Sequence, residues 1–162
     1  MAETDDGVRP ECAAGVLFLD DRGDVLLVEP TYKAMWEIPG GRMEVGETPR
    51  KACERKLREE LALQVPVGRL LVVDWAPHVR EERLRFVFDG GVLTDEQLDV
   101  IELPLHELES WAFVSPEELF VMMEPRLVRR VTAALGAREA GMTRYLEHGV
   151  PVDGQMIKPG AT

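Results

Sequence analysis

Residues 40–65 read GGRMEVGETPRKACERKLREELALQV, a glycine turn that runs directly into a highly charged segment. Thr48 is a favourable N-cap residue, and the proline after it suits the first helical position, where a missing N–H costs nothing. A helix is therefore predicted over residues 48–62. At roughly 100° per residue, its apolar side chains recur on one face, which is expected to pack against the core. They are Cys53, Leu57 and Leu61.

The charged side chains of this helix form a second stripe beside the apolar one. Arg55 and Glu59 fall on one side of Ala52, and Lys56 and Glu60 fall on the other. Runs of charge usually mark a solvated helix face, on which each (i, i+4) ion pair contributes about 0.2–0.5 kcal/mol. A solvated face is thus one interpretation of the stripe.

The turn before the helix suggests a second interpretation. Gly40, Gly41 and Gly46 allow a tight backbone path whose carbonyl groups can face a ligand. Glu47 stands at the helix start, and two adjacent acids follow later in the helix. Such oxygens are the ligands that Mg²⁺ prefers, and substrate phosphates commonly complete its shell. The pattern therefore also fits a metal site that acts on a diphosphate.

The whole chain restricts the class of protein. Its 162 residues suffice for one domain with a substantial core. The net charge of −11 disfavours nonspecific binding to nucleic acid or to an anionic membrane, since both require a basic surface. No apolar run reaches the length of a membrane span, and the acidic start is not typical of a signal peptide. Two well-spaced cysteines, Cys12 and Cys53, fit a reducing cytoplasm.

Apolar runs and turn residues predict several strands in the first part of the chain. Two strands flank a turn at residues 20–23, and the loop from Thr31 leads into a short strand that Pro39 ends. Two further strands are predicted within residues 64–77 and 83–93, the second closed by an Asp-Gly-Gly turn.

The remainder of the chain is predicted to add helices and one more strand. Residues 94–107 are expected to be irregular and to lead into a strand around Trp111. Ser115 would cap a short helix, and a longer amphipathic helix from residue 124 would end at Gly141. Its expected buried stripe is Leu127, Val131 and Leu135. The tail from Thr143 is polar. Together these elements predict a mixed sheet covered by helices, an α/β sandwich.

The stretch from Gly41 to Leu63 resembles the signature of the Nudix family. That signature is a glycine, five residues, a glutamate, seven residues, and then REUxEExGU, where U is aliphatic. Gly41, Glu47 and Arg55 match it, as does the pair Glu59–Glu60, all at the required spacing. The segment WEIPGG and the strand followed by SPEEL also resemble the family, so the likeness covers roughly residues 11–135.

The resemblance implies an α/β/α sandwich and a pyrophosphohydrolase in which Mg²⁺ or Mn²⁺ assists the attack of water on a diphosphate. Matched position by position, Glu59 and Glu60 would bind the metal, with the Gly40 carbonyl as a further ligand. Arg55 would orient neighbouring carboxylates. Glu47 would brace the loop or reach the metal through water.

The resemblance also implies an additional acid shortly before the last strand of the sheet. Glu107, four residues before Trp111, is the candidate, and Glu102 and Glu109 are the alternatives. The other interpretation of Glu107 is an ordinary loop acid.

Two positions depart from the signature: Lys56 replaces a glutamate, and Ala62 replaces a glycine. A lysine neither binds metal nor accepts a proton at neutral pH unless its pKa is strongly lowered. Either Glu54, Glu107 or another loop acid is the base, or the domain is a catalytically impaired module that binds a nucleotide or partner. Ala62 is expected to matter little, because alanine favours a helix.

Four more residues are candidates for binding the substrate. Trp36 could stack on a base and Lys33 could meet a phosphate, although a packed tryptophan and a solvated lysine fit the sequence too. Arg83 and Arg85 alternate on a predicted strand and share one face. That face could contact substrate anions or simply be exposed.

The sequence thus predicts a cytoplasmic hydrolase of a nucleoside diphosphate derivative, without stable binding to nucleic acid or membrane. Residues 1–10 are expected to be a flexible tail, 11–140 the Nudix domain and 141–162 a C-terminal extension. Dimers are common in the family, so a homodimer is one expectation.

Overall fold

A mixed sheet organises the protein, and its strand order is β6-β2-β1-β5-β4-β7-β8, with β3 paired to β1. This architecture comes from a computed structural model that describes residues 4–152. Strands β1 and β5 are parallel, as are β4 and β7, whereas β2 and β6 are antiparallel. The strands are β1 (Glu11–Leu19), β2 (Val25–Pro30), β3 (Gly40–Arg42), β4 (Leu70–Trp75), β5 (Arg83–Val92), β6 (Leu108–Val114), β7 (Arg144–Glu147) and β8 (Val150–Pro151).

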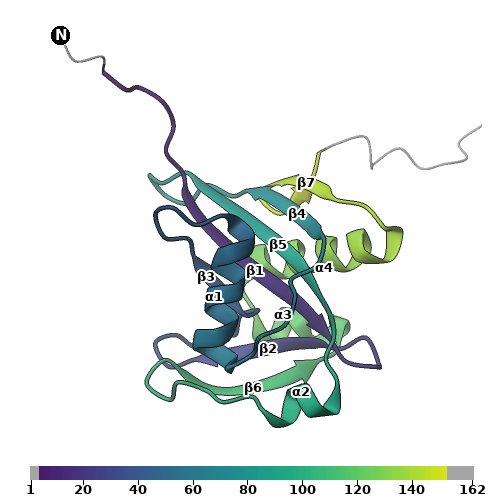
Figure 1. Cartoon of the computed structure of the whole chain (residues 1–162). Coiled ribbons are helices and arrows are strands. Elements are labelled where there is room, and N and C mark those ends of the chain that lie inside the picture. Colours follow the sequence, from purple (N-terminus) through teal and green to yellow (C-terminus); the bar gives the residue numbers. More distant parts are fainter. Residues whose placement is uncertain (1–3, 153–162) are drawn as a thin grey trace, which may run out of the picture.

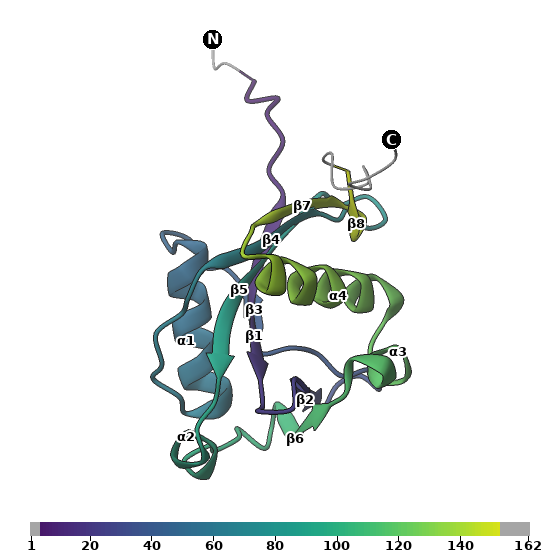
Figure 2. The same cartoon turned by 90° about the vertical axis from the view of Figure 1, so that its right-hand side faces the viewer.

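Helices cover both faces of this sheet. Figures 1 and 2 show α1 on one face and α4 on the other, with α2 and α3 near the β2–β6 end. The helices are α1 (Pro49–Leu61), α2 (Asp95–Asp99), the 3₁₀ turn η1 (Pro116–Glu118), α3 (Leu119–Met122) and α4 (Pro125–Ala140). This layered α/β architecture confirms the fold class predicted from the sequence.

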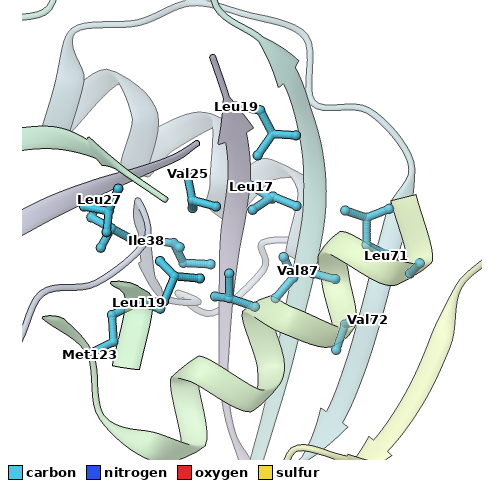
Figure 3. Packing of buried hydrophobic residues seen from close by; sticks show 14 of the residues in the cluster. Leu17, Leu19, Val25, Leu27, Ile38, Leu71, Val72, Val87, Leu119 and Met123 are labelled. Carbon is cyan, nitrogen blue, oxygen red and sulfur yellow. The ribbon is translucent and has the colours of Figure 1, made fainter. Parts of the chain in front are cut away.

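Strand β1 lies at the centre and is buried on both sides. Its alternate side chains face opposite ways, as the pleat of a strand requires. Val16 and Phe18 pack with the apolar stripe of α1. Leu17 and Leu19 pack in a second cluster with residues of α3 and α4, which Figure 3 shows from close by. Because of this double burial, β1 is held in a single register and fixes the position of the segments paired with it.

Several elements differ from the prediction. The segment expected to be irregular contains α2, which has a complete capping box: Thr94 accepts from the Gln97 N–H, and the Gln97 side chain accepts from the Thr94 N–H. Ser115 makes no side-chain cap, and the turn after it is 3₁₀. The short strand predicted before Pro39 instead begins after it, at Gly40, because it must pair with β1.

The buried stripe of α4 also differs. Its fully buried residues are Val131, Ala134 and Ala137, whereas Leu127 and Leu135 are half-buried. Small side chains let the helix lie close to the sheet, so the contact face is centred on alanines rather than on the larger leucines. The helix does end at Gly141, which has φ 68°.

The segment after α4 extends the sheet. Strand β7 pairs parallel with β4, and β8 pairs antiparallel with β7. The carboxylate of Asp74 on β4 is fully buried and accepts from Arg130 Nε at 2.7 Å and from Gly149 N at 3.0 Å. The start of the polar tail is therefore part of the folded sheet. Residues 153–162 lie outside the described residues, and the three boundaries assigned from the sequence remain predictions.

The C-terminal end of α1 corrects one expectation. Ala62 lies beyond the helix with φ 55° and ψ 30°, in the left-handed region, and its N–H donates to the Arg58 carbonyl at 3.1 Å. Because Ala62 is not helical, its helix propensity does not matter. Instead, an L-residue in the left-handed conformation carries a penalty of about 1–2 kcal/mol.

We expect Ala62→Gly to raise the free energy of unfolding by roughly 0.5–1 kcal/mol. Glycine relieves the backbone strain but makes the unfolded chain more flexible, which offsets part of the gain. Urea unfolding measures the difference. As a control, Ala133→Gly within α4 should instead lower stability by about 1 kcal/mol. Equal losses in both variants would show that residue 62 is not strained.

Candidate active site

Helix α1 forms as predicted and presents the charged stripe toward the glycine turn. Thr48 caps it by accepting a hydrogen bond from Lys51 N at 3.2 Å. Its apolar face is completely buried, and burial raises the pKa of the Cys53 thiol to about 12. Cys53 is therefore an uncharged core residue.

The charged stripe is not a solvated face. Both expected (i, i+4) pairs are present, but the side chains of Arg55, Lys56 and Glu60 are only 18%, 13% and 7% exposed. Glu59 alone, at 47%, has the exposure of a surface residue. The solvated-face interpretation is thus wrong for three of the four residues. Burial makes their charges interact more strongly than they would in water.

Three carboxylates surround the ammonium of Lys56. The distances from Nζ are 3.3 Å to Glu60 Oε1, 3.5 Å to Glu59 Oε2 and 3.7 Å to Glu107 Oε1. Burial acts to lower the pKa of Lys56, but the attraction of Glu60, Glu107 and Glu59 outweighs it and raises the pKa above its usual value. Lys56 therefore remains charged at neutral pH and does not act as the base.

Glu60 is the most buried of the three acids. Its Oε2 accepts from the Gly40 N–H at 3.3 Å, which ties the helix to the glycine turn. Burial raises the pKa of Glu60 to about 7, although Lys56 and the Gly40 N–H both act in the opposite direction. A cation close to this carboxylate favours its charged form, and any further cation that binds here would do the same.

Both glycines of the turn lie in close contacts, but only Gly40 meets backbone atoms and therefore excludes a side chain; a side chain at Gly41 would displace the flexible Lys56. Gly40 has φ 149°, and a Cβ there would lie 2.3 Å from the Ala14 carbonyl oxygen. A Cβ at Gly41 would lie 2.8 Å from Cε of Lys56. The absence of both side chains lets the turn approach β1 and lets Lys56 lie across it.

Arg55 ties the helix to the loop that precedes it. Its guanidinium donates to Glu47 at 2.7 and 2.9 Å, to the Arg42 carbonyl at 2.9 Å and to Glu59 at 3.2 Å. Glu47 also accepts from Glu44 N at 2.7 Å. The hydrogen bonds from Arg55, with that from Glu44 N, lower the pKa of Glu47 to about 2. Glu47 does not line the cleft, so its geometry suits bracing of the loop.

This pair gives a pH dependence of stability with a defined sign. Between about pH 4.5 and pH 2, the unfolded chain binds a proton at Glu47 that the folded protein does not. Stability from this pair is thus complete above about pH 4.5 and is lost as the pH falls through 2. We expect urea unfolding of Arg55→Gln to show a shallower loss over this window than the wild type. Arg58→Gln, on the exposed side of α1, should keep the wild-type slope; identical slopes in all three proteins would contradict the assignment.

The structure separates the alternative acids. Glu107 lines the cleft, and its carbonyl accepts from Thr31 N at 3.0 Å. Glu102, Glu109 and Glu54 do not line it. The sequence signal for Glu107 was only its position before a strand; its proximity to α1 depends on how the loop before β6 crosses the turn.

The basic residues expected to bind substrate are also near the turn. Arg83 and Arg85 lie side by side on β5, and both pair with Glu11, Arg85 at 3.0 Å and Arg83 at 3.6 Å. Their face is therefore not simply solvent-exposed. Lys33 pairs with Glu37, and the half-buried Trp36 packs against the core cluster that includes α3. The tryptophan is thus partly structural.

Two adjoining cavities form the cleft. One, of about 670 Å³, contains the three acids, Lys56 and Arg55. The other, of about 400 Å³, runs along the sheet toward α4. They share seven lining residues: Ala13, Lys33, Glu37, Gly40, Gly41, Arg83 and Arg85. Tyr32 also lines the cleft, as an aromatic just before the glycine turn that could stack on a base. Glu11, Arg126 and Arg130 line it too but carry no local sequence signal, since each belongs to an ordinary strand or helix pattern.

The carboxylates at this site have the oxygen ligands that a divalent ion requires, but the Lys56 ammonium occupies the position that the ion would take. Glu59 and Glu60 supply hard oxygens beside the glycine turn, as Mg²⁺ requires. However, no three Asp, Glu, His or Cys side chains within residues 4–152 form a ready metal cluster. The ammonium instead lies among the three acids. An ion can bind there only if the side chain of Lys56 moves out from between them.

The chain belongs to the Nudix family of hydrolases: the NUDIX domain model matches residues 9–135. Proteins of this family are generally pyrophosphohydrolases that act on small nucleotide derivatives and use divalent metal ions. None of the helices within residues 4–152 has the length and apolarity needed to cross a membrane.

Similar proteins carry several different activities. Over 86 residues, the chain is 35% identical to an ADP-ribose pyrophosphatase of Mycobacterium tuberculosis, covering 49% of this chain and 42% of that protein. Over 134 residues, it is 25% identical to a putative 8-oxo-dGTP diphosphatase of Bacillus subtilis, covering 80% and 84%. The fold matches that of a UDP-X diphosphatase with a TM-score of 0.72 at 19% identity, covering 89% of this chain and 70% of that one. The matched segment thus spans less than half of the mycobacterial enzyme.

Proposed function

We propose that this protein hydrolyses the diphosphate linkage of a nucleoside diphosphate derivative with a divalent ion, Mg²⁺ or Mn²⁺. The observation that carries the proposal is the convergence of Glu59, Glu60 and Glu107 on one point beside the Gly40–Gly41 turn. Lys56 neutralises part of the charge of these acids, and a divalent ion in its place would neutralise more. Basic side chains around them supply the opposite charge that a diphosphate requires.

Each residue is proposed to have one role in this reaction. Glu59, Glu60 and the Gly40 carbonyl would hold the ion, which when bound polarises a phosphoryl oxygen and activates water. Arg55 holds Glu59 in place through its own anchor on Glu47. Glu107, whose side chain is 40% exposed, is the candidate to accept the proton of the attacking water.

Positive side chains are placed to bind the phosphates. Lys33, Arg83 and Arg85 line both cavities beside the turn, and Trp36 borders the inner one. Once displaced from the acids by an ion, the Lys56 ammonium would also be able to reach a phosphate oxygen. The named activities of the relatives, on ADP-ribose and on nucleotides, support a nucleoside diphosphate derivative as the substrate class. We place this activity in the cytoplasm, with a homodimer as the proposed assembly.

A substrate panel tests the proposal. Purified protein is incubated with ADP-ribose, UDP-glucose, NAD⁺ and nucleoside triphosphates in H₂¹⁸O, with Mg²⁺, Mn²⁺ or EDTA. We expect one or more compounds to be cleaved only with a divalent ion, with ¹⁸O in a phosphate of the product. Absence of cleavage with either ion, or cleavage unaffected by EDTA, would argue against a metal-dependent hydrolase.

The position of Lys56 favours a second candidate function, a module that binds a nucleotide without turning it over. In such a module, the Lys56 ammonium would take the position of the ion and bind the diphosphate directly. The three acids would hold the ammonium in place. This candidate predicts equally tight binding of ADP-ribose in Mg²⁺ and in EDTA, with no product in either. Binding that requires Mg²⁺ excludes it.

A further inference from the structure

The inner cavity of about 400 Å³ has a chemistry of its own. The acid cluster lies outside this cavity, since Glu59, Glu60 and Glu107 do not line it. From the glycine turn it follows β1 and β5 and ends beneath the first turns of α4, where Arg126 and Arg130 line it. Its volume lies within the range of small-molecule sites. A ligand whose diphosphate lies over the turn would extend one end into this cavity.

Positive charge dominates the lining. Five basic side chains line the cavity against two acidic ones, Glu37 and Glu124. Four of the five have a carboxylate partner: Lys33 pairs with Glu37, Arg83 with Glu81, Arg85 with Glu11 and Arg130 with Asp74. The fifth is Arg126.

Within residues 4–152, Arg126 is held in place by an uncharged partner alone. Its Nη1 donates to the Pro77 carbonyl at 2.7 Å, so an uncharged oxygen fixes the guanidinium. In the part of the chain that the structure describes, the Arg126 guanidinium makes no ion pair. The Arg126 side chain is half-buried. A guanidinium has five N–H donors, and this geometry leaves most of them for a ligand. A half-buried cation without a counter-ion is unfavourable, so an anion that supplies one gains affinity.

The neighbouring arginines add to the positive charge around Arg126. Burial lowers the pKa of Arg85, and although Glu11 opposes that effect, the charges of Arg130 and Arg83 lower it further. Positive groups in the lining thus repel one another even with their partners in place. An incoming anion relieves that repulsion, whereas a neutral group does not.

We propose that the inner cavity is an anion subsite, in which Arg126 binds a second acidic group of the substrate. This proposal rests on the proposed function and narrows its substrate class. The ligand is a nucleoside diphosphate derivative that also carries a phosphate ester or a carboxylate away from the diphosphate. A neutral sugar or base in the same cavity is the alternative that the experiment must exclude.

The test compares matched ligands that differ by one anionic group: UDP-glucuronic acid with UDP-glucose, NADP⁺ with NAD⁺, and coenzyme A with dephospho-coenzyme A. Binding is measured by equilibrium dialysis in Mg²⁺ and in EDTA, with intact ligand quantified by chromatography so that turnover is corrected. We expect the anionic member of at least one pair to bind the wild type about tenfold more tightly, as a charge-assisted hydrogen bond allows.

Three variants assign the effect to Arg126. Arg126→Gln should reduce the preference for the anionic member to about twofold, and Arg126→Lys should retain part of that preference. Arg22→Gln, an identical charge change in the exposed turn after β1, should keep the full preference. Melting temperatures check that each variant folds.

Failure of this proposal is distinguishable from failure of the proposed function. Equal binding within every pair, a preference that survives Arg126→Gln, or no binding of any anionic member at millimolar concentration overturns the anion subsite. Hydrolysis of a diphosphate without any such preference leaves the function standing and removes the subsite. A preference lost in Arg126→Gln without hydrolysis supports the subsite on a domain that only binds.

Discussion

Lys56→Glu is expected to tighten the binding of Mg²⁺ by about 10- to 100-fold and to raise the rate of hydrolysis. A unit charge about 4 Å from another contributes about 4 kcal/mol at an effective dielectric constant of 20. Only part of this interaction energy adds to the affinity of the variant for Mg²⁺, because the wild-type ammonium can move away from the acids when an ion arrives. The substitution removes the competing cation from among Glu59, Glu60 and Glu107 and adds a carboxylate. Calorimetric titration with Mg²⁺ measures the affinity.

Lys56→Gln separates the two parts of this effect. It removes the ammonium but adds no charged ligand, so its Mg²⁺ affinity should fall between those of the wild type and Lys56→Glu. Without metal, Lys56→Glu places a fourth acid among three and should melt at a lower temperature than the wild type. Mg²⁺ should reverse that loss, because it binds only the folded protein. Unchanged Mg²⁺ affinity in both variants would mean that Lys56 does not occupy the cation position.

The second large effect is expected for Glu59→Gln combined with Glu60→Gln. These acids are the proposed ligands, and glutamine keeps their size while removing both charges. We expect the rate of divalent-dependent hydrolysis to fall by at least about 10²-fold, the lower end of what loss of an acid–base or electrostatic group causes. Steady-state hydrolysis of whichever substrate the panel identifies measures the change.

Two observations guard this experiment against misinterpretation. Glu54→Gln lies on the same helix and does not line the cleft, so its activity should match the wild type. Glutamine at position 60 can still accept from the Gly40 N–H, so the fold should persist, and the melting temperature verifies this. Turnover that survives in the double variant would remove these acids from the chemistry.

Some features of the fold follow from local sequence. The N-cap at Thr48 and the apolar stripe of α1 were predicted because both depend on neighbouring residues. The sequence TDEQ at residues 94–97 is likewise a capping-box pattern, in which a threonine precedes a glutamine by three positions. Helix α2 therefore has a local sequence signal of the same kind as the N-cap of α1. Strand β7 carried no comparable signal, since four residues with mixed burial form a strand only because the edge of β4 lies beside them.

The candidate site likewise combines features set by local sequence with features set by tertiary contacts. The spacing of the charged residues on α1 placed Arg55, Lys56, Glu59 and Glu60 near one another, since a helix brings (i, i+4) residues together. Whether these charges face water depends on what covers them, and here the glycine turn and the loop of Glu107 do so. The left-handed backbone of Ala62 also appeared only in the folded chain.

By itself, the sequence determined the helix, its acids, the glycine turn and the family, because each is a pattern within one short segment. Only the tertiary structure decided that Lys56 lies among three carboxylates and that Arg126 faces the inner cavity without a carboxylate partner among residues 4–152. Burial and charge balance depend on segments far apart in the chain, such as the loop before β6, strand β5 and the start of α4. Their approach is set by packing on the two faces of the sheet, which no local pattern encodes.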